Sequence, residues 1–403
     1  MVEFLVIGTI AGLIQVAAAL PWIAVLDPLA FKGWLRRARS SLLGIQVVGG
    51  IIIALVAGVV LFRVYVTDRD QLLFWGRVYA SLLQLQLTAD ALVLVFVLLL
   101  KLWPQGAAVT LAAFREGIRQ PMFWLLTLAA LLMLFISPWL PYFTFGEDLK
   151  MVKEIGYDTI MLAATAFGVL AASMSISEEI EGKTAITLMS KPVSRRQFLL
   201  GKFAGILLAA LGMTLLLGWC FIWLLLFKER WDPMSVANPM EKKPDPAWVV
   251  SLLNGLDLSS YSLDFLRGAG IWADDLANIG LGLVLGACQL TVLLAIAVAL
   301  ATRLPMLLNL VICLVVFFLG HLTPILMAIS QKRYALVRFT AEVFDHVLPG
   351  LELYDTGPVV IRDNPPPQGD FALYVLSVTG YSLLYTAIAL LFGLILFEDR
   401  DLA

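Results

Sequence analysis

The sequence is dominated by recurring apolar stretches, each long enough to cross a membrane. A spanning helix needs roughly 20 apolar residues, because each residue adds about 1.5 Å and the hydrocarbon core is about 30 Å thick. A chain with 61% hydrophobic and only 14% charged residues is too apolar for a soluble globular domain. Since backbone polar groups in lipid must be satisfied within the spanning segment, these stretches predict helices and an all-α polytopic membrane protein.

Hydropathy predicts about nine transmembrane helices. They are Val2 to Val25, Leu42 to Val66, Tyr79 to Leu102, Met122 to Phe143, Thr159 to Ile176, Leu200 to Phe227, Leu281 to Ala301, Met306 to Met327 and Phe371 to Phe397.

Basic residues predict the orientation of these spans. The linkers after the first, third, fifth and seventh spans are basic, and include Arg36, Arg115, Arg195 and Arg303. Lys and Arg concentrate in cytoplasmic loops, so these linkers are expected on the cytoplasmic side of the cell membrane. The N-terminus is then outside the cell and the C-terminus is in the cytoplasm. The long linkers 228–280 and 328–370 then lie outside. Within them, helical spacing over Trp248 to Leu256 and Tyr334 to Leu348 predicts two short helices at the outer surface.

One charged insert, residues 177–202, interrupts the apolar pattern between the fifth and sixth spans. It begins with acidic residues, continues through Gly182-Lys183-Thr184 and a short apolar run, and ends in a basic stretch containing Pro192. Glutamates near a helix start favour its positive dipole end, and proline ends a helix at or before the preceding residue. The insert therefore predicts a short, charged helical segment tied directly to two spans.

A second amphipathic segment precedes the fourth span. Leu111, Phe114 and Ile118 share one helical face, while Arg115, Glu116 and Arg119 lie on another. This spacing predicts a helix lying in the inner interface of the membrane.

Together these two segments resemble ABC-2 type transporter permeases, the transmembrane subunits of ABC exporters. The resemblance runs from about Val109 to the C-terminus. It implies a six-helix ABC-2 core within residues 106–403, preceded by three additional N-terminal helices within residues 1–105. It also implies that the cytoplasmic coupling loop 177–202 and the connecting helix contact an ATPase. The residues expected to couple to the ATPase are Glu178, Glu179, Glu181, Gly182, Thr184, Leu188, Pro192, Ser194 and Arg195, with Arg115 and Arg119.

The same resemblance implies the partners. The sequence has no Gly-x-x-x-x-Gly-Lys-Ser/Thr loop, so ATP and magnesium are expected on a separate ABC ATPase subunit and no cofactor or metal is expected in this chain. A second permease, either a copy of this chain or a different one, is expected beside it in the lipid bilayer. A net charge of -2 gives no indication of nucleic acid. Lipid-linked compounds, polysaccharides, peptides and drugs all remain open as exported substrates.

Other interpretations fit parts of the sequence. The basic insert also suits an ordinary cytoplasmic loop, and the amphipathic helix an anchor for the next span. The whole chain also suits a non-transport membrane scaffold or sensor. A membrane-embedded enzyme is disfavoured, because the chain has only two histidines and neither a His-x-x-x-His pair nor a Gly-x-Ser-x-Gly elbow.

Asp90 is an acid near the middle of the third predicted span. A carboxylate at that depth costs at least a few kcal/mol unless it is paired, protonated or hydrated. Two interpretations stay open: a proton or substrate role, or membership with Gln84 and Gln86 in a polar seam that docks the additional spans to the core.

Overall fold

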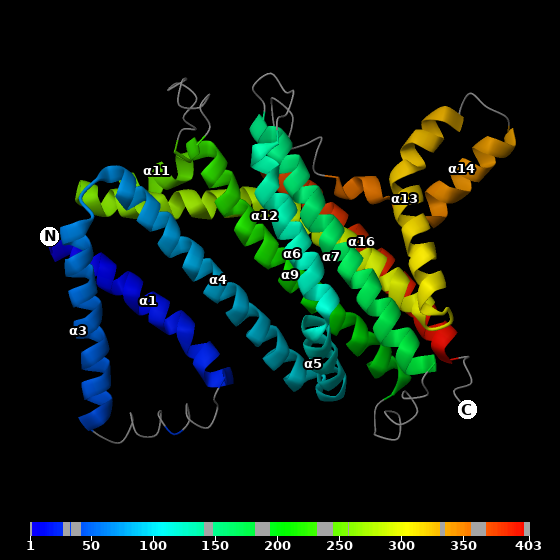
Figure 1. Ribbon diagram of the computed structural model, residues 1–403, viewed down its shortest axis with the longest axis horizontal. Coiled ribbons are helices and arrows are strands. Elements are labelled where there is room, and N and C mark those ends of the chain that lie inside the picture. The colour runs from blue at the N-terminus through cyan, green and yellow to red at the C-terminus, as the bar shows by residue number, and fades with distance from the viewer. Residues whose placement is uncertain are drawn as a thin grey trace. The chain divides into compact units, whose positions relative to one another are not determined.

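The computed structural model describes residues 2–26, 33, 42–140, 148–181, 194–231, 245–256, 258–330, 335–355 and 368–398. The regular structure of these residues is entirely helical, with no strand among them (Figure 1). The chain divides into two compact units: residues 1–97 with 240–277, and residues 98–239 with 278–403.

Eight helices of the described residues are long and apolar enough to cross a membrane, which confirms the all-α polytopic membrane fold. They are α1 (Val2–Leu26), α4 (Arg69–Leu102), α6 (Pro121–Ile136), α7 (Asp148–Glu181), α9 (Arg195–Trp231), α12 (Ser260–Ala301), α13 (Met306–Ser330) and α16 (Gln368–Glu398). The second predicted span forms α3 (Leu42–Tyr65), in which the apolar stretch Gly49–Tyr65 is shorter than in the other eight. This helix accounts for the difference from the nine predicted.

Several helices extend well beyond the predicted spans. The largest difference is α12, which begins at Ser260 instead of Leu281 and has 42 residues. A helix of that length is about 63 Å long, roughly twice the thickness of the hydrocarbon core. Much of the predicted outer linker 228–280 is therefore helix. Hydropathy finds only the apolar part, whereas polar residues continue a helix when they have partners; Asp274 Oδ1, for example, accepts a 2.8 Å hydrogen bond from Trp248 Nε1.

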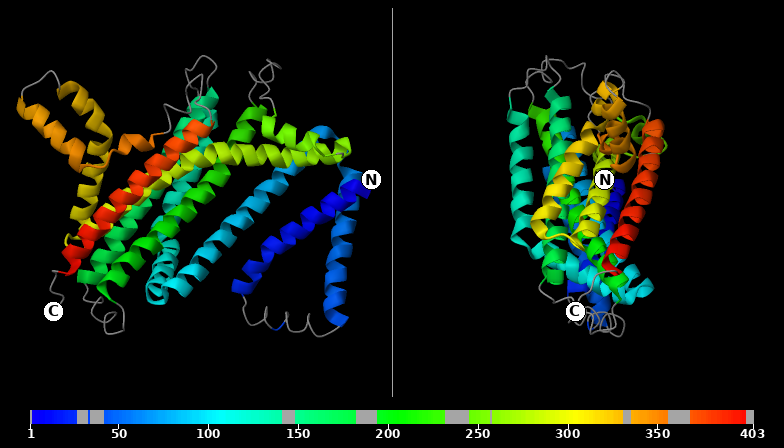
Figure 2. Two further views of the ribbon diagram at one scale, coloured as in Figure 1. Left: turned by 180° about the vertical axis from the view of Figure 1, so that it is seen from behind. Right: turned by 90° about the vertical axis from the view of Figure 1, so that its right-hand side faces the viewer.

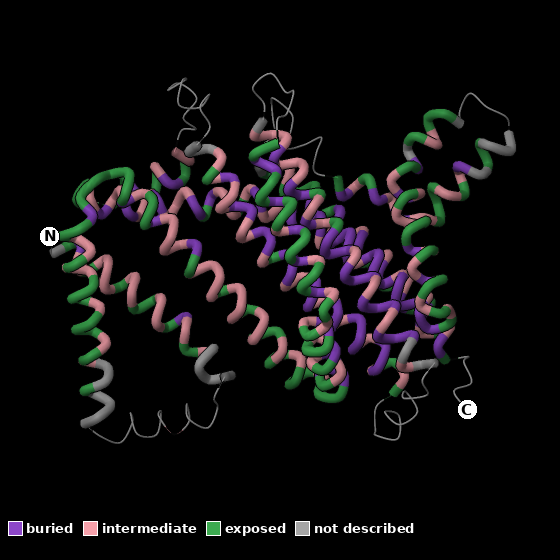
Figure 3. The backbone as a smooth tube through the Cα atoms, in the orientation of Figure 1, coloured by how far each residue is buried: buried purple, intermediate pink, exposed green. Residues whose placement is uncertain are grey.

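The first unit is assembled around an aromatic cluster at one end of its helices. Phe4 of α1 packs edge-on against Tyr261 of α12, with ring centroids 4.5 Å apart, and Phe62 and Phe265 complete the cluster. Next to it, α4 and α12 cross at van der Waals distance, because a Cβ on Gly76 would lie only 2.1 Å from the Phe265 carbonyl oxygen. Away from this end, most residues of α1, α3 and α4 are partly or fully exposed (Figure 3).

The second unit is packed along the full length of its central helices. In it, α7 and α9 run side by side, as the two opposite views in Figures 1 and 2 show. Buried residues follow both helices (Figure 3). Its shorter elements are α5 (Pro104–Arg119), η1 (Ser137–Trp139), α14 (Ala335–Val347) and η3 (Leu351–Tyr354).

The two short helices predicted in the long linkers both form. α14 corresponds to the segment predicted from Tyr334 to Leu348, and α11 (Ala247–Asn254), in the first unit, corresponds to the one predicted from Trp248 to Leu256. The side of the membrane on which they lie stays a prediction.

Candidate functional site

The amphipathic helix α5 is packed directly on α9 through small residues. On α9, Gly201 and Gly205 are four positions apart and therefore share one face. A Cβ on Gly205 would lie 2.5 Å from the Thr110 carbonyl oxygen, and one on Gly201 would lie 2.7 Å from Val109 Cβ. Small residues at this spacing allow two helix backbones to approach closely. The α5 residues buried at this contact and beside it are Gly106, Ala107, Thr110, Ala113 and Gly117.

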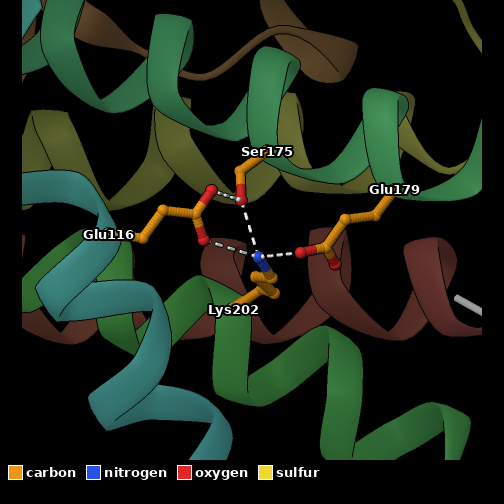
Figure 4. A network of polar contacts seen from close by, with 4 residues as sticks. All are labelled: Glu116, Ser175, Glu179 and Lys202. Atoms are coloured by element: carbon orange, nitrogen blue, oxygen red, sulfur yellow. Dashed lines mark hydrogen bonds and ion pairs between the residues drawn. The ribbon is translucent and has the colours of Figure 1, made fainter. Parts of the chain in front are cut away.

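This close approach brings the lysine next to Gly201 into contact with two other helices. The Lys202 ammonium of α9 donates hydrogen bonds to Glu179 Oε1 at 2.6 Å, Ser175 Oγ at 2.7 Å and Glu116 Oε2 at 3.0 Å (Figure 4). Ser175 and Glu179 belong to α7, and Glu116 belongs to α5. The Ser175 hydroxyl in turn donates to Glu116 Oε1 at 3.1 Å. We call these four residues the Lys202 cluster.

Burial explains why the lysine needs so many partners. The Lys202 side chain is 5% exposed, and an unpaired ammonium in such a site costs several kcal/mol. All three ammonium N–H groups have acceptors, two of which are carboxylates. Hydrogen bonds between charged groups are roughly twice as strong as those between neutral ones. The cluster therefore joins α5, α7 and α9 at one point.

The start of α9 is fixed by a capping box. Ser194 Oγ accepts a hydrogen bond from the Gln197 backbone N–H at 3.2 Å, and Gln197 Oε1 accepts one from the Ser194 N–H at 2.9 Å. This reciprocal pair satisfies two backbone donors and ends the preceding segment at Ser194. Gln197 Nε2 also donates to Gln105 Oε1 of α5 at 2.7 Å, which gives α5 and α9 a second polar contact.

Arginines bind the C-terminal end of α16. Arg195 Nη1 donates to the carbonyl oxygens of Phe397 and Glu398 at 2.8 and 2.9 Å, and Arg196 pairs with the Glu398 carboxylate at 2.9 Å. From the turn between α12 and α13, Arg303 Nε donates to the Leu396 carbonyl oxygen at 2.8 Å. The last carbonyls of a helix lack partners within the helix and carry its negative dipole end, so cations bind them favourably.

Polar contacts also join α7 to α12, to α13 and to the turn between them. Asn309 is fully buried and donates to Ser173 Oγ at 2.9 Å and to the Ala297 carbonyl oxygen at 3.0 Å. Ser177 Oγ donates to the Leu304 carbonyl oxygen at 3.2 Å. Together with the Lys202 cluster and the arginines on α16, these bonds form a closed series of contacts from α9 to α7, to the α12–α13 turn, to α16 and back to α9. We call this series the polar ring.

The predicted coupling residues fall into three groups. Glu179, Ser194 and Arg195 take part in the contacts between helices of this chain that are described above. Arg115 and Arg119 are exposed on α5. The others lie wholly or by their side chains outside the described residues: Glu178 and Glu181 in the last turn of α7, and Gly182, Thr184, Leu188 and Pro192 in the segment between α7 and α9.

Asp90 lies in α4, in the first unit. Its Oδ1 atom is buried and has no hydrogen-bond partner among the described residues, and the same holds for Gln86 Oε1. Gln84 Oε1, by contrast, accepts a 2.8 Å hydrogen bond from Trp272 Nε1 of α12. Gln84 thus attaches α4 to α12 within the first unit, while both interpretations of Asp90 stay open.

The sequence prediction did not assign site roles to Glu116, Ser175, Lys202 or Asn309. One signal was present, since Gly201 and Gly205 predict a close helix crossing and Lys202 lies beside them. The identity of the facing carboxylates depends on how α5, α7 and α9 pack, which hydropathy does not specify.

Comparison with known families finds a match that covers part of this site. Residues 118–239 match the family model described as ABC-2 family transporter protein. The match includes α6, α7, α9 and the segment between α7 and α9. No curated protein matches the chain.

Proposed function

We propose that this membrane protein, which carries an ABC-2 transporter domain, is the permease subunit of an ATP-driven exporter in the cell membrane. A separate ATPase subunit hydrolyses ATP, and the permease converts its movement into movement of substrate across the bilayer. The observation that carries the proposal is the family match, because it includes the charged segment 177–202 together with the spans on both sides of it.

The anchoring of this segment supports a role in coupling. Its entry is held by Glu179 through Lys202, and its exit by the Ser194 capping box and the bonds of Arg195 to α16. A force applied to the segment therefore reaches α7, α9 and α16 through directional polar contacts. Transport proteins use such rigid-body movements of helices to alternate between conformations.

The proposal divides the coupling residues by role. Glu178, Glu181, Gly182, Thr184, Leu188 and Pro192 contact the ATPase, and Arg115 and Arg119 on the exposed face of α5 add basic contacts. Glu179, Ser194 and Arg195 hold the ends of the segment in place. ATP and magnesium are bound by the partner, because no phosphate-binding loop occurs in this sequence.

The proposal includes the assembly and orientation. The permease acts with a second permease, identical or different, and with the ATPase on the cytoplasmic side. The end of the second unit that carries the polar ring is then cytoplasmic, since basic residues such as Arg195, Arg196 and Arg303 gather there. The N-terminus lies outside the cell.

Affinity purification from detergent-solubilised membranes tests the proposal. The wild-type chain is compared with Arg115→Glu/Arg119→Glu, a change confined to exposed side chains. Arg338→Glu, at an exposed arginine of α14, is the matched control. The wild type and the control are expected to co-elute with a chain that has a nucleotide-binding loop and hydrolyses ATP. The amount of this chain recovered with the double variant is expected to be at least tenfold lower at equal membrane levels. Failure of any ATPase to co-elute with the wild type favours the alternative, a non-transport scaffold or sensor.

A further inference from the structure

We infer that Lys202 is a positioning residue. It makes α5 move together with α7 and α9 when the ATPase moves the segment that joins α7 to α9. This inference rests on the proposed function for its last step, the response to ATP. Its structural part concerns this chain alone.

The position of the cluster in the chain gives the first argument. Glu179 lies in the last turn of α7, and Lys202 lies near the start of α9. Their 2.6 Å contact joins the end of α7 to the start of α9, which residues 182–193 connect in the sequence. The same ammonium binds Glu116 of α5 at 3.0 Å. One side chain therefore connects α7 and α9 to α5, which is separated from α7 in the sequence by the span α6.

The character of the α5–α9 contact gives the second argument. The α5 residues buried in the structure are small, and small residues such as Gly205 and Ala113 let the two helix backbones approach closely. Charge-assisted hydrogen bonds are directional and add geometric specificity to such a contact. Gln105 and Gln197 form an exposed polar contact between the same helices. Lys202 is the buried contact that fixes α5 relative to both α7 and α9.

The charge balance of the cluster predicts the effect of removing the lysine. Glu116 and Glu179 both approach the ammonium within 3.0 Å. Without it, two carboxylates from different helices face one site, and like charges repel. Lys202→Met therefore pushes α5 and α7 apart. A neutral triple variant, Lys202→Met with Glu116→Gln and Glu179→Gln, removes this repulsion and leaves the small-residue packing without charge-assisted bonds.

Amide hydrogen exchange of the full chain in lipid nanodiscs tests the structural part. The amides of α5, residues 105–119, exchange at least tenfold faster in Lys202→Met than in wild type, and the triple variant gives an intermediate rate. Lys202→Arg retains most of the protection, because arginine also donates to both carboxylates. Arg119→Gln, on the exposed face of the same helix, matches wild type. Wild-type protection of α5 in both Lys202→Met and the triple variant overturns the inference.

The functional part uses the complex with its ATPase and needs no known substrate. Exchange is compared between the nucleotide-free complex and the complex trapped with ADP and vanadate, with α14 as the distant reporter. In wild type, trapping changes exchange in both α5 and α14. In the triple variant, the α14 response falls by more than half. A full α14 response in the triple variant overturns the inference and leaves the proposed function standing. A wild-type complex without ATPase activity or a nucleotide response overturns the proposed function itself.

Discussion

The two units of the chain solve the packing of membrane helices in different ways. In the most apolar stretch of α4, in the first unit, no residue is buried within the protein, whereas 67% of the corresponding stretch of α7 in the second unit is buried. Each unit has a glycine crossing, at Gly76 and Gly268 in the first and at Gly201 and Gly205 in the second. The second unit adds the polar ring.

This difference shows what close contacts at glycines and directional polar bonds each contribute. Helices in lipid are already satisfied by their own backbone hydrogen bonds, so a few close contacts suffice to hold α4 in the first unit. Defined movement needs more, because small-residue contacts alone give few directional bonds. The family match lies wholly within the second unit, where the directional bonds of the polar ring are found.

The largest expected effect is at the glycine crossing of the second unit. In Gly205→Leu, even the Cβ would lie 2.5 Å from the Thr110 carbonyl oxygen and 2.6 Å from Ala113 Cβ, so α5 and α9 must separate. Overpacking of this kind costs about 3 kcal/mol. Thermal unfolding in detergent measures the loss. Gly212→Leu in the same helix is the control, since no atom of the described residues other than its own helix backbone lies within 4 Å of its Cβ position. Equal stability of the two variants contradicts the described crossing.

The corresponding change in the first unit is Gly268→Ala. Its Cβ would lie 2.2 Å from the Leu73 carbonyl oxygen, and displacement of α4 costs roughly 2 kcal/mol. Hydrogen exchange is expected to rise in α4 and to stay unchanged in α7 and α9, because these two helices belong to the other unit. Gly58→Ala in α3, whose Cβ would meet no other part of the described chain within 4 Å, serves as the control. A rise of the same size in α7 would break the comparison between the units.

Asn309 tests the polar ring at its most buried member. Asn309→Leu removes three side-chain hydrogen bonds, two donated by Asn309 and one accepted from Cys313, and leaves the Ala297 carbonyl without that donor, at a cost of about 1–2 kcal/mol. The unfolding temperature of the purified protein measures this effect. The neighbouring change Leu308→Val alters a side chain that is 45% exposed and is expected to have little effect. If Asn309→Leu is as stable as wild type or more stable, packing alone holds α7, α12 and α13 together at the polar ring.

Asp90 tests the first unit with a smaller expected effect. Because Asp90 Oδ1 has no partner among the described residues and an unpaired carboxylate at this depth is costly, Asp90→Asn is expected not to lower stability. Trp272→Phe, which removes the bond to Gln84, costs about 1 kcal/mol. Unchanged ATP hydrolysis by the complex of the Asp90→Asn chain with its ATPase favours the polar-seam interpretation of Asp90. Loss of ATP hydrolysis at normal membrane levels favours a proton or substrate role.

The smallest effect concerns pH and Glu352 in η3. Burial, followed by the charge of Asp345, raises the pKa of Glu352 above its ordinary value, while His321 opposes the rise. The protonated form is therefore favoured in the folded state, and stability is lost as pH rises through the folded-state pKa. Glu352→Gln is expected to be slightly more stable than wild type at neutral pH and equal to it below the ordinary carboxyl range. Since the side chain is exposed, salt reduces the difference.

Hydropathy predicted the fold class and the approximate position of each span, because apolar length is a local property of the sequence. It did not predict the start of α12 at Ser260, since polar residues such as Asp274 remain helical through contacts made elsewhere in the first unit. It also did not predict the Lys202 cluster. Glu116, Ser175 and Lys202 are far apart in sequence, and only the packing of three helices brings them together.

Photo-crosslinking in cells tests the central claim most directly. A photoreactive amino acid replaces Leu188 in the segment between α7 and α9, and Leu383, an exposed residue of the apolar helix α16, serves as the control position. The account predicts that Leu188, but not Leu383, crosslinks to a protein with a nucleotide-binding loop. If Leu188 in a normally inserted chain gives no such adduct, the segment does not contact an ATPase and the permease account is contradicted.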